Sequence, residues 1–114
     1  IYWDLAHRFF EESWDEICGI SYPLIINEHR LGFPAVSTSS THHSPLRYGD
    51  TVYCTLSVSM VGKSSTVWNY SFSDQTGRLV WTGEVTTVCV NLDSFESIEI
   101  PSIFADALHN FSEN

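Results

Sequence analysis

The spacing of apolar residues changes along this chain from helical to alternating, and this change restricts the folds that it can adopt. Near the start, apolar side chains recur at helical spacing over residues 5–18, as Leu5, Phe9, Phe10, Trp14, Ile17 and Cys18. From residue 51 onward apolar and polar residues alternate, as in "TVYCTLSVSMV". One long helix followed by half-buried strands predicts an α+β fold in which an antiparallel sheet wraps the helix.

Capping and turn residues set the expected boundaries of these elements. Asp4 is expected to cap the helix, and Gly19 to end it, with Pro23 preventing its continuation. A loop through "NEHRLGFP" should follow. "PLRYGD" and "DQTG" read as turns, and a short helix is expected after Pro101. We predict one domain over residues 1–114, with four strands connected as a meander at residues 35–43, 51–61, 64–73 and 79–92.

Composition excludes several classes of partner. The net charge of −9 would repel a phosphate backbone, so a nucleic-acid partner is not expected. Apolar runs such as "LII" are too short to span a membrane. Cys18, Cys54 and Cys89 are odd in number, widely spaced and form no C-x-x-C pair. They are therefore interpreted as buried thiols of a reduced, cytoplasmic protein, without zinc or a disulfide framework.

Several motifs, taken in order, carry a resemblance to a known family. "PLRYGDTV", "GKSSTVWNYSF", "GRLVWTGEVTTVCVNLDS" and "EIP" follow one another, and "IYWDLAHRFFEESW" precedes them. Together they resemble the 4-hydroxybenzoyl-CoA thioesterase family of hotdog-fold acyl-CoA thioesterases, over nearly the whole chain. The resemblance implies a hotdog fold and a homodimer or homotetramer with shared active sites. It also implies an acyl-CoA substrate, with coenzyme A as part of that substrate and no separate cofactor or metal.

The same resemblance implies the catalytic groups. In the family a backbone N–H in the first turn of the central helix polarises the thioester carbonyl, and the matching residue here is Trp3. Unpaired N–H groups at a helix start favour such a developing negative charge on general grounds. The family's Asp, in "D-x-D-x-x-G", falls ahead of the position that matches Ile1. A strand and an Asp-bearing loop are therefore expected upstream of Ile1.

Carboxylates on the helix offer an alternative base. A related hotdog group takes its catalytic Glu from this helix, so Glu11 or Glu12 could substitute for the Asp. The competing interpretation is a solvated carboxylate, or one that pairs with Arg8. Asp4 and His7 could form an acid–base or metal pair, against a helix cap with an exposed histidine.

Residues for substrate binding are expected in the second half of the chain. In the family a Lys or Arg at the position of Lys63 contacts the phosphates of coenzyme A, with Ser64 and Ser65 beside it. A surface lysine is the alternative, and Arg47 and Arg78 are weaker candidates. His42 and His43 are adjacent in an extended segment and should point to opposite faces, so one of them, assigned as His43, could line a substrate pocket.

The predicted activity is hydrolysis of an acyl-CoA to free acid and coenzyme A. A non-catalytic acyl-binding or dimerisation module is the alternative outside enzymes. A hotdog dehydratase or hydratase would need a signature such as "D-x-N-P-x-H", which the sequence does not contain. Acyl preference is left open. Coenzyme A is favoured over an acyl carrier protein, because an acidic chain would repel an acidic carrier.

Overall fold

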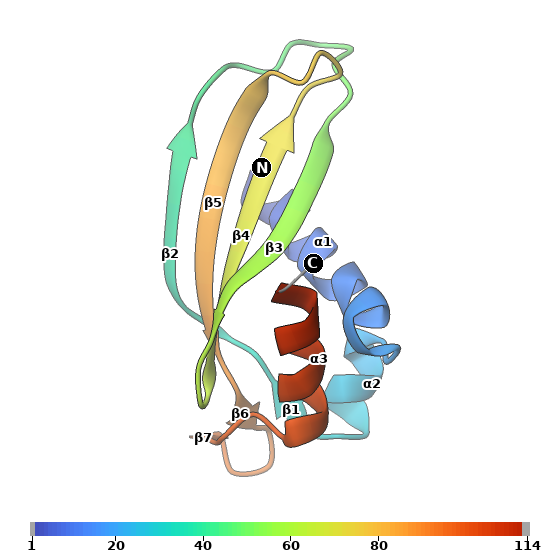
Figure 1. The fold of residues 1–114 in the computed structure, drawn as a ribbon, viewed down its shortest axis with the longest axis vertical. Helices are drawn as coiled ribbons and strands as arrows, with labels where there is room; N and C mark the ends of the chain where they lie inside the picture. The colour runs from blue at the N-terminus through green and yellow to red at the C-terminus, as the bar shows by residue number, and fades with distance from the viewer. Residues whose placement is uncertain (1, 113–114) are drawn as a thin grey trace.

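The computed structural model describes residues 2–112 and contains three helices and two antiparallel sheets within them (Figure 1). The elements, in chain order, are α1 (Tyr2–Cys18), α2 (Tyr22–Asn27), β1 (Leu31–Gly32), β2 (Ala35–His42), β3 (Tyr53–Val61), β4 (Ser65–Ser73), β5 (Leu79–Val88), β6 (Val90–Asn91), β7 (Glu96–Ser97) and α3 (Ser102–Ser112). This order confirms the α+β class, the long first helix and the final helix after Pro101.

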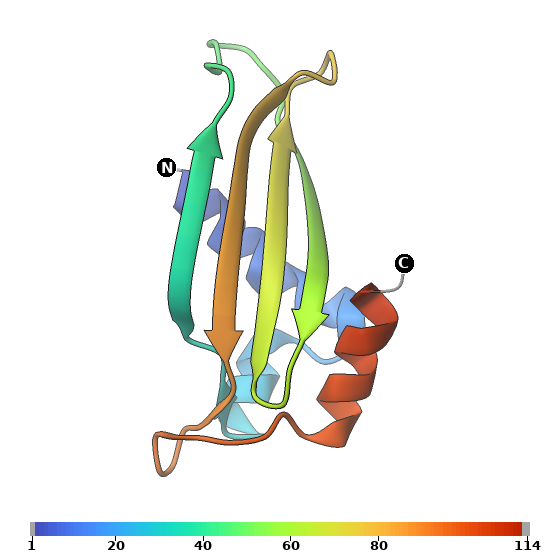
Figure 2. The ribbon, with the colours of Figure 1, turned by 60° about the vertical axis from the view of Figure 1, so that its left-hand side comes forward.

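The main sheet has the strand order β2-β5-β4-β3, with every neighbouring pair antiparallel (Figure 2). β3, β4 and β5 form the expected meander. The prediction is wrong for β2, which pairs with β5 rather than β3, in a register that runs from Ala35 opposite Thr87 to His42 opposite Trp81. Alternation identifies a strand but not its neighbour, because both edges of the meander offer the same backbone groups.

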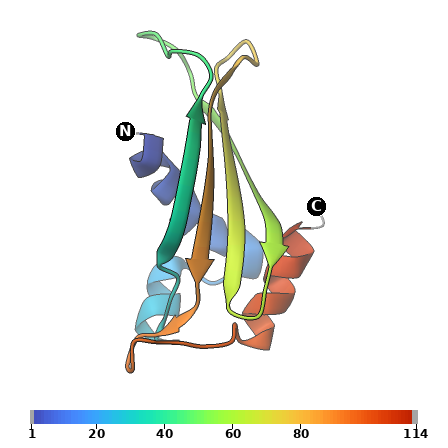
Figure 3. The same ribbon diagram turned by 90° about the vertical axis from the view of Figure 1, so that its left-hand side faces the viewer.

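The helix α1 crosses one face of the main sheet (Figure 3). The strand β4 explains this packing, since its residues alternate strictly between buried and half-buried positions. Trp68, Tyr70 and Phe72 face the helix, while Asn69 and Ser71 face away from it. Alternation with a period of two therefore places one apolar face of the sheet against the apolar stripe of α1.

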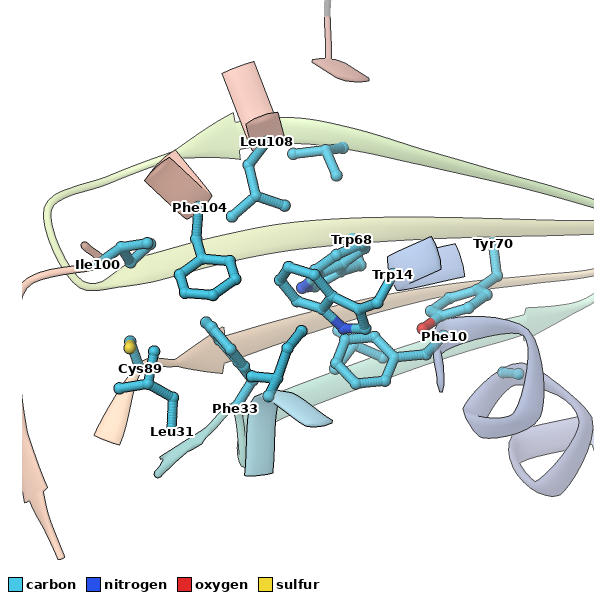
Figure 4. Packing of buried hydrophobic residues seen from close by; sticks show 14 of the residues in the cluster. Phe10, Trp14, Leu31, Phe33, Trp68, Tyr70, Cys89, Ile100, Phe104 and Leu108 are labelled. Carbon is cyan, nitrogen blue, oxygen red and sulfur yellow. The ribbon is translucent and has the colours of Figure 1, made fainter. Parts of the chain in front are cut away.

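Aromatic side chains make most of the contact between the layers (Figure 4). Trp14, in the C-terminal half of α1, is fully buried and lies 4.8 Å from Phe33, 5.7 Å from Trp68 and 6.3 Å from Phe104, measured between ring centroids. Phe10 meets Trp68 edge-on at 4.9 Å. These rings join α1, α3 and the sheet in one core, as their sizes and geometry favour.

The ends of α1 test two of the expected boundaries. The cap prediction is wrong, because α1 begins at Tyr2 and Asp4 lies inside its first turn. Its carboxylate still complements the positive end of the helix dipole. Gly19 ends the helix as predicted: it has φ +72°, and its N–H donates to the carbonyl oxygen of Asp15 at 2.9 Å.

The first helix ends before Pro23, as expected, but the separate helix α2 was not predicted. Ser21 precedes the helix in an extended conformation, and Pro23 occupies its first turn. Proline fits there because the first helical N–H groups lack an intrahelical acceptor. Within residues 2–112, no helix combines the length and the apolar character needed to cross a bilayer.

Candidate active site

A cavity of about 700 Å³ lies between α1, α2 and the part of the sheet formed by β2, β4 and β5. Most of its wall is apolar or aromatic, and its polar side chains come from His7, Tyr22, Thr38, Tyr70 and Thr87. Its residues are Trp3, Ala6, His7, Phe10, Tyr22, Ile26, Gly32, Phe33, Pro34, Ala35, Thr38, Tyr70, Val85, Thr87, Val90, Leu92 and Phe95. Such a pocket suits an apolar ligand with few polar groups.

Trp3 places the start of α1 at this cavity. It lies in the first turn, and its side chain lines the cavity while packing edge-on against Trp81 at 4.9 Å. Tyr2 stacks on the same ring, with centroids 5.5 Å apart and planes 10° from parallel. Because a helix has no internal acceptors for its first N–H groups, the N–H of Trp3 is free of an i−4 bond. The first turn thus packs against Trp81 beside an apolar space.

Two carboxylates of α1 lie on different sides of the helix. Glu11 accepts from His7, with 2.9 Å between Nε2 and Oε1, and the His7 ring lines the cavity and stacks on Phe10. Among the described residues, the carboxylate partner of His7 is therefore Glu11 and not Asp4. Glu12 instead borders a second groove of about 400 Å³, formed with Phe9, Ser13, Glu16, Cys54, Leu56 and Phe111.

The tyrosine Tyr70 gives the cavity wall a buried hydroxyl. Its side chain is almost fully buried, and burial raises its pKa well above the ordinary value. Burial also raises the pKa of Tyr22. Both hydroxyls therefore stay protonated at neutral pH and can donate a hydrogen bond inside the cavity.

Comparison with known proteins now places the chain. The model of the thioesterase superfamily matches residues 13–80, which is more than half of the sequence. The chain belongs to the thioesterase superfamily. Among curated proteins, no sequence matches it.

Solved structures agree with this superfamily at the level of fold. A Staphylococcus aureus protein in complex with CoA superposes with a TM-score of 0.84 and 18% identity, covering 99% of this chain and 71% of its own. A gentisyl-coenzyme A thioesterase superposes with a TM-score of 0.79 and 24% identity, covering 90% of this chain and 80% of its own. A 1,4-dihydroxy-2-naphthoyl-CoA thioesterase from Synechocystis superposes with a TM-score of 0.82 and 20% identity, covering 96% of this chain and 80% of its own. The predicted hotdog fold is confirmed.

Within this thioesterase fold, the residues expected to bind coenzyme A lie away from the cavity. Lys63 and Ser64 lie in the turn between β3 and β4, Ser65 is the first residue of β4, and none of the three lines the cavity. Their backbone carbonyls are used structurally: Ile100 donates to Lys63, Cys89 to Ser64 and Gly62 to Ser65, at 2.7–2.9 Å. The Lys63 side chain is exposed.

The two adjacent histidines point to opposite faces, as predicted. His42 lies against Tyr2 on the helix side, with ring centroids 5.5 Å apart. His43 reaches Thr82 on the other face, with 3.0 Å between Nε2 and Oγ1. Neither residue lines the cavity.

The three cysteines of this chain are free thiols, and each is at least partly buried. Cys89 is buried, while Cys18 and Cys54 are half-buried. Burial raises the pKa of Cys54 and of Cys89 to about 11, and also raises that of Cys18. These thiols remain protonated at neutral pH, so they lack the character of nucleophiles.

Sequence reasoning missed most of the cavity wall. Tyr70 was recognised only as part of a strand, although its inward position follows from the alternation in "SSTVWNYSFS". Phe95 carries no periodic signal, because it lies in a turn. Nothing local in the sequence indicates that these two residues border one space with Trp3.

Proposed function

We propose that this chain is an acyl-CoA thioesterase that hydrolyses an acyl-CoA to the free acid and coenzyme A. The observation that carries the proposal is the apolar cavity bordered by the first turn of α1, in a chain of the thioesterase superfamily. The cavity would hold the acyl group. The two thioesterases described above are named for aromatic acyl-CoA substrates, and the narrower 4-hydroxybenzoyl-CoA family is part of the proposal.

The helix start supplies the electrophilic half of the proposed mechanism. The N–H of Trp3 donates to the thioester carbonyl oxygen and stabilises the negative charge that forms there. Water adds to the carbonyl carbon while a carboxylate takes its proton. The intermediate then expels coenzyme A by breaking the C–S bond, and the thiolate takes up the proton.

As the substitute for the Asp expected upstream of Ile1, we assign Glu11 rather than Glu12, with the His7 ring relaying the proton to it, because Glu11 itself does not line the cavity. Glu11 is joined to His7, whose ring lines the cavity, whereas Glu12 borders the other groove. Glu11→Gln should lower kcat by about a hundredfold or more, the typical contribution of a general base. Glu12→Gln serves as the matched control and should stay within twofold of the wild type. An equal loss in both variants, or none in either, would remove Glu11 from this role.

The oligomer is part of the same proposal. β2 is exposed along its whole length, and within residues 2–112 it forms an edge of the main sheet with no strand beyond it, so two copies can join there in a homodimer, or further in a homotetramer. The turn between β3 and β4, which carries Lys63, and the end of β2, which is followed by His43, lie at opposite ends of the main sheet (Figure 1). Both groups could contact one coenzyme A only if they come from different subunits.

The contact proposed for Lys63 can be separated from the chemistry. Lys63→Ala should raise KM for an acyl-CoA severalfold and leave hydrolysis of the matching acyl-N-acetylcysteamine thioester unchanged, since that substrate lacks phosphates. A fall in both rates would indicate a structural role for the lysine.

Free, protonated cysteines are in keeping with a cytoplasmic location, which we propose as well.

Release of free thiol from a panel of aliphatic and aromatic acyl-CoA esters tests the activity directly. Turnover above the uncatalysed rate for at least one ester is expected. No turnover on any ester, together with measurable binding of acyl-CoA, would instead establish a non-catalytic acyl-binding module.

A further inference from the structure

Phe95 is an unusual residue at the edge of the cavity. It lies in the turn between β6 and β7, its side chain is 79% exposed, and it nevertheless lines the cavity. Its backbone has φ +58°, in the left-handed region. That region is rare for bulky residues, because their Cβ atom approaches the following carbonyl oxygen.

The surrounding turn holds this conformation firmly. The N–H of Phe95 donates to the carbonyl oxygen of Asn91 at 2.6 Å, and the Asn91 side chain accepts from the N–H groups of Asp93 and Ser94 at 2.8 and 3.2 Å. The Arg30 guanidinium then joins Asp93 at 3.0 Å. The turn is thus fixed to the segment that follows α2.

Glycine or asparagine would occupy this position with less strain, and an exposed phenyl ring adds little to the stability of the free protein. Backbone strain of this kind tends to persist where it serves a function. The function that the geometry offers is contact with whatever fills the cavity.

We propose that Phe95 contacts the part of the acyl group farthest from the thioester, and thereby sets the preference for acyl length. This inference rests on the proposed thioesterase function. Trp3 lies in the first turn of α1, while β6 and β7 lie at the end of the molecule away from that turn in all three ribbon views (Figures 1–3). A thioester held at Trp3 therefore directs its acyl group along the apolar wall towards Phe95.

The test uses binding as well as turnover. Phe95→Asn keeps a residue that tolerates the left-handed region and removes the phenyl ring. Affinities of the full chain are measured by calorimetry for the non-hydrolysable thioether analogues of butyryl-CoA and dodecanoyl-CoA. We expect the variant to bind the dodecanoyl analogue about fivefold more weakly, through loss of apolar contact. It should bind the butyryl analogue within twofold of the wild type and melt at the same or a higher temperature.

A matched control is Tyr48→Ala, which removes an exposed aromatic side chain that does not line the cavity. It should change neither affinity. Equal weakening of both analogues in Phe95→Asn, or no weakening of either, overturns the inference, as does a wild type that binds neither. Length-dependent binding without turnover by the wild type would support the role of Phe95 and refute the proposed hydrolysis.

Discussion

A buried side-chain hydrogen bond joins the two inner strands under α1, in addition to their backbone pairing. Trp68 donates from its indole Nε1 to Oγ1 of Thr87 at 2.9 Å, and both side chains are buried. A buried donor that loses its partner keeps the full cost of leaving water. Removal of one partner is therefore expected to destabilise the fold by more than the net contribution of the hydrogen bond itself.

Thr87→Val keeps the shape of the side chain and removes the acceptor. We expect it to lower the free energy of unfolding by about 1–3 kcal/mol, measured by urea denaturation. Thr86→Val, at the neighbouring half-buried position on the other face of the sheet, should change it by about 0.5 kcal/mol or less. Similar losses in the two variants would contradict the account.

At the scale of elements, the turn between β4 and β5 is organised by one carboxylate. Oδ1 of Asp74 accepts from Oγ1 of Thr76 at 2.6 Å and from the N–H groups of Thr76 and Arg78 at 2.9 and 3.1 Å. These hydrogen bonds hold the pKa of Asp74 below its ordinary value, and the bond from the Thr76 hydroxyl has the largest effect. Gly77 completes the turn at φ +86°, within the segment "DQTG" that was predicted to form it.

This lowered pKa makes the turn sensitive to acid. A carboxyl whose pKa is lower in the folded state stabilises the fold above its unfolded pKa of about 3.9, and this stabilisation disappears as the pH falls through the folded value. Asp74→Asn should therefore be less stable than the wild type at pH 6, and the difference should narrow at pH 3. Thermal unfolding across this range provides the measurement. A difference that is constant with pH would exclude the charge as its cause.

The elements also show where prediction from sequence succeeds. The strands β3, β4 and β5 have a clear period of two and short turns, so their pairing follows from local signals. β2 was placed correctly along the chain but beside the wrong neighbour, because the choice of edge depends on how the segment of residues 43–52 crosses the end of the sheet. α2 has only six residues, too few for a helical period to be recognised.

At the scale of the whole molecule, one core connects every large element. Phe104 of α3 is buried against Trp14 of α1 and lies 5.3 Å from the His29 ring. The core residues of α1 were predictable from their spacing. Of the candidate site, the family resemblance indicated Trp3 and Glu11. It did not indicate the cavity wall, since the cavity is assembled from residues of seven different elements and the segments that connect them.

Phe104→Ala should show this connection. Loss of a buried ring leaves a cavity, so the free energy of unfolding should fall by about 3–5 kcal/mol. Near- and far-ultraviolet circular dichroism should shift together, because α3 shares its core with α1 and the sheet. Ile103→Ala, at an exposed position of the same helix, should have a small effect. Separate transitions for the two signals would mean that α3 unfolds on its own.

The exposed strand β2 has a consequence for how copies of this chain behave at different ionic strengths. Its sequence, "AVSTSSTH", contains no Asp, Glu, Lys or Arg, so its edge lacks the charges that commonly discourage pairing. Each copy nevertheless carries a net charge of −9. The charges that repel a second copy therefore lie outside β2, and added salt screens this repulsion. Association measured by sedimentation should tighten as salt is raised from about 0.01 M to 0.15 M, a range over which the screening length falls from about 30 Å to 8 Å.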